Sequence, residues 1–248
     1  MPGHVAWLTE RPFAHRGLHD LAAGAPENSM AGFRAAVGAG FGIELDVRLS
    51  RDGVAMVFHD AGLDRLCGRP GLVRDTDSIE LGKMTLLGTP ETVPTLTEVL
   101  AFIAGRAPLL IEIKNSGLEA VEPVAAAVAA AIKDYAGPVA IQAFNPRILA
   151  WFQSHAPAVV RGQIIDLKRP DGRFSWLRLA VLRYLLERRH GAPQFLSYDL
   201  ERLPAPLAAR AKRDGLPLLG WTVRTPAQRA RAKQLVDNII FEAAGRPS

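Results

Sequence analysis

Short runs of apolar residues alternate with longer stretches of helical character along the whole chain. The short runs are rich in β-branched residues and predict strands at 11–15, 42–49, 109–113, 139–142, 159–164, 194–198, 217–222 and 238–241. The longer stretches predict helices at 29–39, 118–135, 146–155, 204–214 and 226–235. Eight strands in 248 residues leave 248/8 = 31 residues for each strand–helix unit. Repeated units of this kind form a parallel sheet, and eight of them favour a closed TIM (β/α)8 barrel of the α/β class.

Two segments depart from this repeat, although no linker is long enough to divide the chain, and we predict one domain over 1–248. The run 54–58 predicts an additional strand that forms a hairpin with 42–49. The segment 60–94 is rich in Gly, Pro, Asp and Thr, which predicts a loop insertion over one end of the barrel. No Gly-rich fingerprint follows the first strand, which disfavours a dinucleotide-binding sheet.

The composition is that of an ordinary globular protein, with 48% hydrophobic and 22% charged residues. It excludes disorder, collagen and coiled coil as descriptions of the whole chain. The single cysteine, Cys67, excludes an intrachain disulfide and a zinc–thiolate cluster. Lysine and arginine total 30 against 25 acidic residues, a net charge of +5. This excess suits an anionic substrate, but without a groove-reading motif it does not predict nucleic-acid binding.

The chain shows no targeting or membrane-spanning pattern. Its first eleven residues include Glu10 and lack the basic start and long apolar core of a signal peptide. The uncharged run 123–132 is too short and too rich in alanine for a membrane span. We therefore expect a soluble, cytoplasmic protein.

Acidic residues lie inside two of the predicted strands. Glu44 and Asp46 alternate with aliphatic residues and therefore share one face, and Glu112 and Lys114 repeat the pattern in the next strand. In a barrel the aliphatic residues suit the helix side, so the charged residues point inward, where they must neutralise one another or share a counter-ion. Three carboxylates predict a site for Mg²⁺ or Ca²⁺. The alternative is a structural ion-pair network with Lys114 and an arginine, and the repetition on two strands favours the metal.

Two histidines stand where strands of the predicted barrel end. His15 closes the first strand, and His59 closes the return strand of the hairpin. Both are expected at the mouth of the barrel beside the acidic strands. Imidazoles titrate near neutral pH and can serve as base and acid in one turnover, which makes this pair a candidate for acid/base catalysis.

A series of short motifs runs through almost the whole chain. In order, they are His15-Arg16-Gly17, Pro26-Glu27-Asn28-Ser29, Phe33, Glu44-Leu45-Asp46-Val47, Asp52-Gly53, His59-Asp60, Leu63, Arg65, Val93-Pro94-Thr95-Leu96, Ile111-Glu112-Ile113-Lys114, Phe144-Asn145 and Trp221-Thr222-Val223. Each piece alone is weak, but the ordered set is specific and resembles the glycerophosphodiester phosphodiesterase family. The resemblance implies a TIM barrel that uses one divalent cation and hydrolyses small-molecule glycerophosphodiesters to sn-glycerol 3-phosphate and an alcohol.

The resemblance also implies roles for individual residues. The positions that match metal ligands are Glu44, Asp46 and Glu112, and those that match the acid/base pair are His15 and His59. The positions that match substrate contacts are Arg16 and Lys114 at the phosphate, Asn28 near the metal and Trp221 in the substrate cleft. The attacking group in this family is either the neighbouring glycerol hydroxyl, which gives a cyclic phosphate, or water.

Some of these residues have simpler interpretations. Arg16 could form a surface salt bridge, Asn28 could cap the following helix, and Trp221 could pack the barrel. The chain also departs from the family pattern at two places. Serine replaces the common threonine at Ser29, and the last strand lacks the usual Thr-Asp-Xaa-Pro and instead ends Ile240-Phe241-Glu242-Ala243. We expect the mouth around the eighth strand to differ from that of relatives.

The segment 171–189 is both basic and strongly apolar, with its arginines and leucines spread around a predicted helix. A helix lying on a membrane would separate them more sharply. The favoured interpretation is therefore a barrel helix or lid whose second face meets another subunit, and membrane-surface contact is the alternative. Two alternative functions also stay open. One is a phospholipase D-type lipid phosphodiesterase acting on lysophospholipids, and the other is a catalytically silent barrel that acts as a membrane adaptor.

Overall fold

Nine strands form one sheet in the part of the chain that the structure describes, residues 2–115, 120–166 and 191–242 of a computed structural model. They are β1 (Phe13–Ala14), β2 (Gly42–Leu49), β3 (Ala55–Val57), β4 (Leu109–Ile113), β5 (Val139–Ala143), β6 (Val160–Ile165), β7 (Phe195–Asp199), β8 (Leu218–Val223) and β9 (Asn238–Phe241). The predicted segment 171–189 lies outside these residues.

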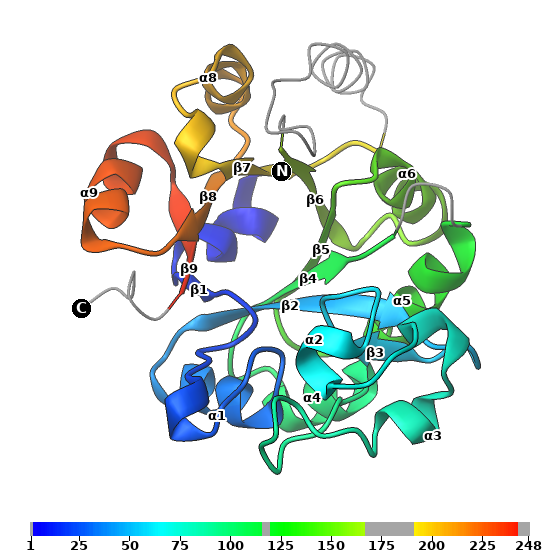
Figure 1. Ribbon diagram of the computed structural model, residues 1–248. Coiled ribbons are helices and arrows are strands. Elements are labelled where there is room, and N and C mark those ends of the chain that lie inside the picture. Colours follow the sequence, from blue (N-terminus) through cyan, green and yellow to red (C-terminus); the bar gives the residue numbers. More distant parts are fainter. Residues whose placement is uncertain (1, 116–119, 167–190, 243–248) are drawn as a thin grey trace.

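The sheet closes on itself as a parallel barrel (Figure 1). Strand β1 pairs in parallel with both β2 and β9, and the others follow in chain order around the ring, with only β3 outside it. Strand β3 pairs antiparallel with β2, as the hairpin pattern predicts. The predicted TIM barrel is confirmed. Strand β1 is shorter than the predicted 11–15 at both ends, and after it Arg16 and Gly17 turn the chain away with positive φ angles of 56° and 80°.

Helices surround the barrel on its outer side (Figure 1). They are α1 (Met30–Gly38), α4 (Leu96–Ile103), α5 (Glu122–Ile132), α6 (Pro146–His155), α8 (Pro206–Arg213) and α9 (Pro226–Leu235), with the 3-10 turns η2 (Leu21–Ala23) and η4 (Leu200–Arg202). Helix α4 was not predicted, although it begins with a capping box between Thr95 and Glu98. Helices α5 and α8 begin later than predicted, each with a proline in its first turn. Among the described residues no helix is both long and apolar enough to cross a membrane, and the cytoplasmic location stays a prediction.

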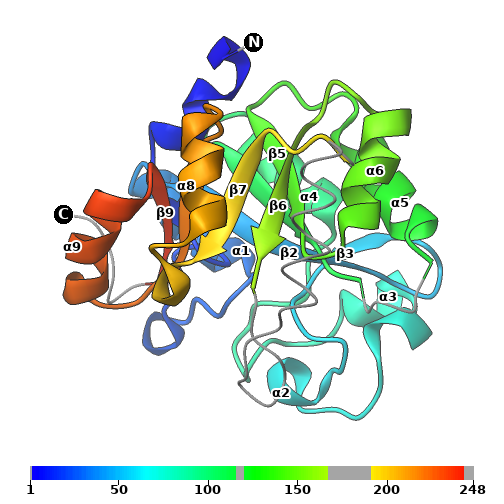
Figure 2. The same cartoon turned by 90° about the horizontal axis from the view of Figure 1, so that it is seen from above.

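The insertion after β3 has a small core of its own. It contains α2 (Asp64–Cys67), η3 (Val73–Asp75) and α3 (Ser78–Leu81). Its buried side chains include Phe58, Leu66 and Leu81. In Figure 2 this insertion lies at the end of the barrel toward which the arrowheads of β6 and β7 point. It therefore covers part of the rim where the strands end, as the composition of 60–94 predicts.

The interior of the barrel is apolar at the opposite end. The inward side chains at the starts of the strands, among them Leu110, Phe195 and Leu219, form one cluster with Val5 and Leu8 of η1 (Pro2–Thr9). Asn238 at the start of β9 donates from Nδ2 to the carbonyl oxygens of Leu8 at 2.6 Å and Arg11 at 2.7 Å, which ties η1 across this end. The barrel is thus plugged at one end, and its polar interior residues gather at the other.

One close approach in this interior depends on a glycine. Gly162 of β6 lies opposite Phe195 of β7, and a Cβ atom at Gly162 would stand 2.2 Å from the Phe195 ring. The ring is completely buried, so it cannot move aside without disturbing the apolar cluster.

We expect Gly162→Ala to lower the free energy of unfolding by about 1–3 kcal/mol through overpacking. Chemical denaturation measures this change. Gly38→Ala is the matched control, because a Cβ atom at the end of α1 meets nothing within 4 Å, and we expect it to be neutral or to stabilise by up to about 1 kcal/mol. Equal stability of the two variants would contradict the packing argument.

Candidate active site

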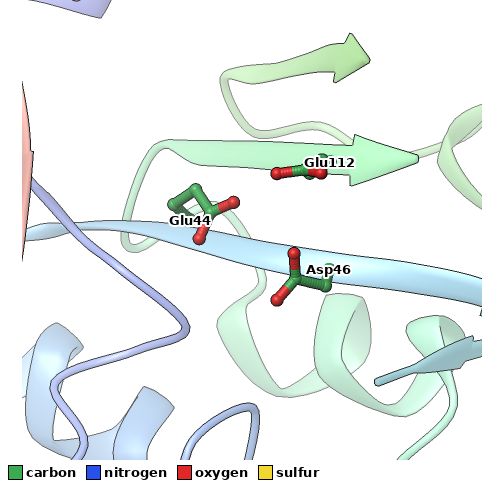
Figure 3. A group of neighbouring side chains, drawn as sticks. All are labelled: Glu44, Asp46 and Glu112. Atoms are coloured by element: carbon green, nitrogen blue, oxygen red, sulfur yellow. The ribbon is translucent and has the colours of Figure 1, made fainter. Parts of the chain in front are cut away.

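Three buried carboxylates meet at the polar end of the barrel. Glu44 and Asp46 project from the same face of β2, and Glu112 projects from the neighbouring β4 (Figure 3). Asp46 and Glu112 are paired in the strand register, which places their side chains next to each other. Ligand oxygens of all three lie within 4.8 Å of one another, and the residues are 1%, 0% and 6% exposed. The structure therefore brings together the acidic residues singled out in the sequence.

Two basic side chains compensate part of this charge. Lys114 Nζ is 2.9 Å from Asp46 Oδ1 and also forms an ion pair with Glu112, and Arg16 Nε is 3.2 Å from Asp46 Oδ2. Burial on its own would raise the pKa of Asp46. The positive charges nearby, that of Lys114 above all, outweigh this effect and lower the pKa. The same carboxylates raise the pKa of Lys114 against the effect of its burial. The predicted alternative, an ion-pair network of the carboxylates with Lys114 and an arginine, is thus present.

Glu44 differs from its two neighbours in its contacts. Its Oε2 accepts the backbone N–H of Arg16 at 3.0 Å and lies 4.0 Å from His15 Nε2. Burial and the charges of Asp46 and Glu112 raise the pKa of Glu44 well above its ordinary value. Burial also raises the pKa of Glu112. When all three carboxylates are ionised, their negative charge exceeds the positive charge of Lys114 and Arg16.

The donor set fits a hard divalent cation. All three side chains offer carboxylate oxygens, the ligands that Mg²⁺ and Ca²⁺ prefer. Asp46 Oδ1 and Glu112 Oε1 are both buried, and the single ammonium group of Lys114 forms ion pairs with both of them. A cation held by Glu44, Asp46 and Glu112 would supply the charge that this group lacks.

The turn after β1 places Arg16 and Asn28 against the trio. Arg16 Nη1 donates to Glu27 at 2.7 Å, so Arg16 belongs to this half-buried network and is not part of a surface salt bridge. Asn28 is buried, donates from Nδ2 to Asp46 Oδ2 at 2.9 Å and accepts the Asp46 backbone N–H at 3.3 Å. The alternative of Asn28 as a helix cap is wrong, because Ser29 Oγ caps α1 by accepting the N–H of Gly32 at 3.1 Å.

His15 is backed by a carboxylate that directly follows the last strand. Its Nδ1 lies 3.0 Å from Glu242 Oε1, and Glu242 in turn accepts two hydrogen bonds from Arg224 at 2.9 and 3.0 Å. Burial lowers the pKa of His15. The hydrogen bond with His15 and those from Arg224 lower the pKa of Glu242 to about 2, so Glu242 is ionised at neutral pH.

His59 has the same kind of support from the insertion. Its Nδ1 lies 2.6 Å from Asp60 Oδ1, and Arg65 of α2 donates to both oxygens of Asp60 at 2.6 and 2.9 Å. Arg65 also donates twice to Glu27 at 2.8 Å, which joins the insertion to the turn that carries Arg16. Burial lowers the pKa of His59, and the hydrogen bonds from Arg65 lower that of Asp60.

A cavity of about 280 Å³ opens between these groups. Of the residues singled out in the sequence, it is lined by His15, Arg16, Glu44, His59, Glu112, Lys114 and Trp221. Trp221 meets Phe144 edge to face at 5.8 Å, so it faces the cavity and not only the barrel core. Asn28 and Asp46 lie behind this lining.

Two residues for which no role was predicted also belong to the site: Gln142 lines the cavity, and Glu242 lies behind His15. Gln142 lies beside Glu112 in the register of β5 with β4, and its Oε1 accepts the hydroxyl of Ser197 at 2.6 Å. Gln142 occupies the inward position of a predicted strand, so the alternation that revealed Glu112 could have revealed it too. Glu242 was noted only as a departure at the end of the last strand. No local spacing links it to His15, which precedes it by 227 positions.

Comparison with known proteins agrees with this geometry. The model of the glycerophosphoryl diester phosphodiesterase family matches residues 15–245. The chain belongs to this family. The glycerophosphodiester phosphodiesterase of Caldanaerobacter subterraneus subsp. tengcongensis is 31% identical over 244 residues, 92% of each chain. The expectation of a phosphodiesterase enzyme is confirmed.

Solved structures share the fold. A phosphodiesterase of Oleispira antarctica, determined in complex with the product sn-glycerol-3-phosphate, has a TM-score of 0.80 at 24% identity and covers 96% of each chain. A glycerophosphodiester phosphodiesterase of Thermotoga maritima has a TM-score of 0.74 at 25% identity, with 92% of each chain covered.

We expect Mg²⁺ or Ca²⁺ to raise the midpoint of thermal unfolding, because an ion that binds only the folded chain stabilises it by about 2.7 kcal/mol at 100 times its Kd. Differential scanning fluorimetry with and without chelator measures the shift. Replacing both glutamates, Glu44→Gln with Glu112→Gln, is expected to abolish it, and the exposed Glu80→Gln is the matched control that keeps it. If neither cation changes the midpoint of the unchanged protein, the carboxylates form only an ion-pair network.

Proposed function

We propose that the chain hydrolyses glycerophosphodiesters to sn-glycerol 3-phosphate and an alcohol, with His15 and His59 as acid and base. The observation that supports this most strongly is the shared cavity, in which two carboxylate-backed imidazoles stand beside the acidic trio. The product bound to the Oleispira antarctica relative supports the same reaction.

Positive charge gathers where an anionic phosphodiester would lie. Arg16 and Lys114 line the cavity and can neutralise the non-bridging oxygens, most strongly as charge grows in the transition state. Glu44, Asp46 and Glu112 would hold Mg²⁺ or Ca²⁺, which supplies Lewis-acid stabilisation of the same oxygens when bound. Trp221 and Phe144 present aromatic surface to the organic part of the substrate.

The histidines divide the proton transfers between them. In each imidazole Nδ1 is engaged by an acidic side chain, which leaves Nε2 for the substrate. One Nε2 takes the proton of the attacking group, and the other gives a proton to the departing alkoxide. The attacking group is the neighbouring glycerol hydroxyl, which gives a cyclic phosphate that water then opens, or water itself.

A chelator-controlled substrate panel tests the proposed function. Glycerophosphocholine, glycerophosphoethanolamine and lysophospholipids are offered in turn, and the phosphorus products are identified by ³¹P NMR. The proposal expects sn-glycerol 3-phosphate from the deacylated substrates, loss of turnover with chelator and recovery with Mg²⁺ or Ca²⁺. Preferential cleavage of lysophospholipids would instead support the phospholipase D-type alternative.

We expect His15→Ala and His59→Ala each to lower kcat by about 10²–10⁴-fold, because each removes one proton-transfer group. Steady-state kinetics with glycerophosphocholine measures the loss. His155→Ala is the matched control, since His155 is exposed on α6 and stacks on Trp151 at 4.5 Å, away from the cavity lining. A near-normal kcat in either site variant would remove that histidine from the proposed mechanism.

A further inference from the structure

The ends of the last two barrel strands hold an ordered chain of contacts to His15. Arg224 follows β8 directly, and Glu242 follows β9 directly. Arg224 grips both oxygens of Glu242 at 2.9 and 3.0 Å, and Glu242 Oε1 lies 3.0 Å from His15 Nδ1. The arginine, the carboxylate and the imidazole thus form one continuous line that ends at the cavity.

The backbones of these residues are fixed as well. The N–H of His15 donates to the carbonyl oxygen of Phe241 at 2.8 Å, and the N–H of Glu242 donates to that of Val223 at 2.9 Å. The N–H of Arg224 donates to Oε1 of Gln228 at 2.7 Å, in the capping box of α9. The backbone of each member is therefore held in place by a hydrogen bond of its own.

We propose that Glu242 is a positioning residue that holds His15 in the tautomer with the proton on Nδ1 and directs Nε2 into the cavity. An ionised carboxylate only accepts hydrogen bonds, so the Nδ1 atom that faces it must be the donor. Nε2 is then left unprotonated on the side of Glu44, whose Oε2 lies 4.0 Å away. This inference rests on the proposed role of His15 in acid/base catalysis.

Arg224 completes the arrangement. Arg224 donates one hydrogen bond to each oxygen of Glu242. A bidentate pair of this kind fixes the orientation of the carboxylate. When His15 takes up a proton, the adjacent negative charge of Glu242 also stabilises the imidazolium. His59, Asp60 and Arg65 repeat the same order of groups on the insertion, so the two histidines of the cavity are held in one way by unrelated segments.

The competing interpretation is an ion pair that only ties the loops after β8 and β9 together. The two interpretations differ in what happens to the His15 ring when Glu242 is changed. A structural tie would alter stability and leave the imidazole tautomer as it was, whereas a positioning residue would alter the tautomer and the chemical step together.

The experiment uses Glu242→Ala, the isosteric Glu242→Gln and the carboxylate-retaining Glu242→Asp in the full chain with Mg²⁺. We expect Glu242→Ala to lower kcat by about 10–10²-fold, the range typical of lost supporting contacts, with KM changed less than twofold, and Glu242→Asp to recover part of the loss. Glu80→Gln is the matched control, because Glu80 is exposed on α3 and is not among the residues that line the cavity. We expect its kcat to stay at the wild-type value.

The tautomer is measured directly by long-range ¹H–¹⁵N NMR of His15, assigned with His15→Ala. The wild-type ring is expected as the Nδ1–H form, and the rings of Glu242→Ala and Glu242→Gln as mixtures with the Nε2–H form. Near-wild-type kcat in Glu242→Ala, or an unchanged tautomer in both variants, would overturn the inference.

A double-mutant cycle separates this inference from the proposed function. If Glu242 acts through His15, its replacement has little further effect in the His15→Ala background. A full additional loss there would show that Glu242 acts independently of His15 and would overturn the inference. If His15→Ala alone keeps wild-type activity, the proposed acid/base role fails, while the tautomer measurement still decides whether Glu242 orients the ring.

Discussion

The site depends on the burial of three carboxylates at one end of the barrel. An uncompensated buried charge is very costly, so Glu44, Asp46 and Glu112 are tolerable only where positive charge reaches them. Lys114 and Arg16 supply part of it through direct ion pairs. The remaining deficit makes this end of the barrel attractive to a cation and, once a cation is bound, to an anionic phosphodiester.

Apolar packing at the other end of the barrel offsets the cost of burying these charges. There the inward positions are apolar and are closed by Val5 and Leu8, so the polar positions are confined to the rim where the strands end. The insertion adds a separate small core, and that core anchors α2, which carries Arg65 beside His59. The side chains that stabilise the fold and those that line the cavity thus lie in different parts of the molecule.

Much of this could be predicted because it is encoded locally. Alternation in β2 and β4 determines which side chains face inward, and the bounds of both strands agree with the prediction. The helix α4 was missed although its capping box, Thr95 with Glu98, is a local signal. The function of Asn28 was harder to predict, because two neighbouring residues can each cap a helix, and only the fold shows that Ser29 does so while Asn28 turns to Asp46.

Contacts that arise from closure of the barrel have no local signal. Asp60 follows His59 in the sequence, so its contact could be suspected from the chain itself. Glu242 reaches His15 only because β1 pairs with β9, which joins the first and last strands. In an open sheet these two strands would lie at opposite edges, and His15 would have no carboxylate behind it. Closure therefore does more than bury the core: it also gives His15 a carboxylate behind Nδ1, as Asp60 does for His59.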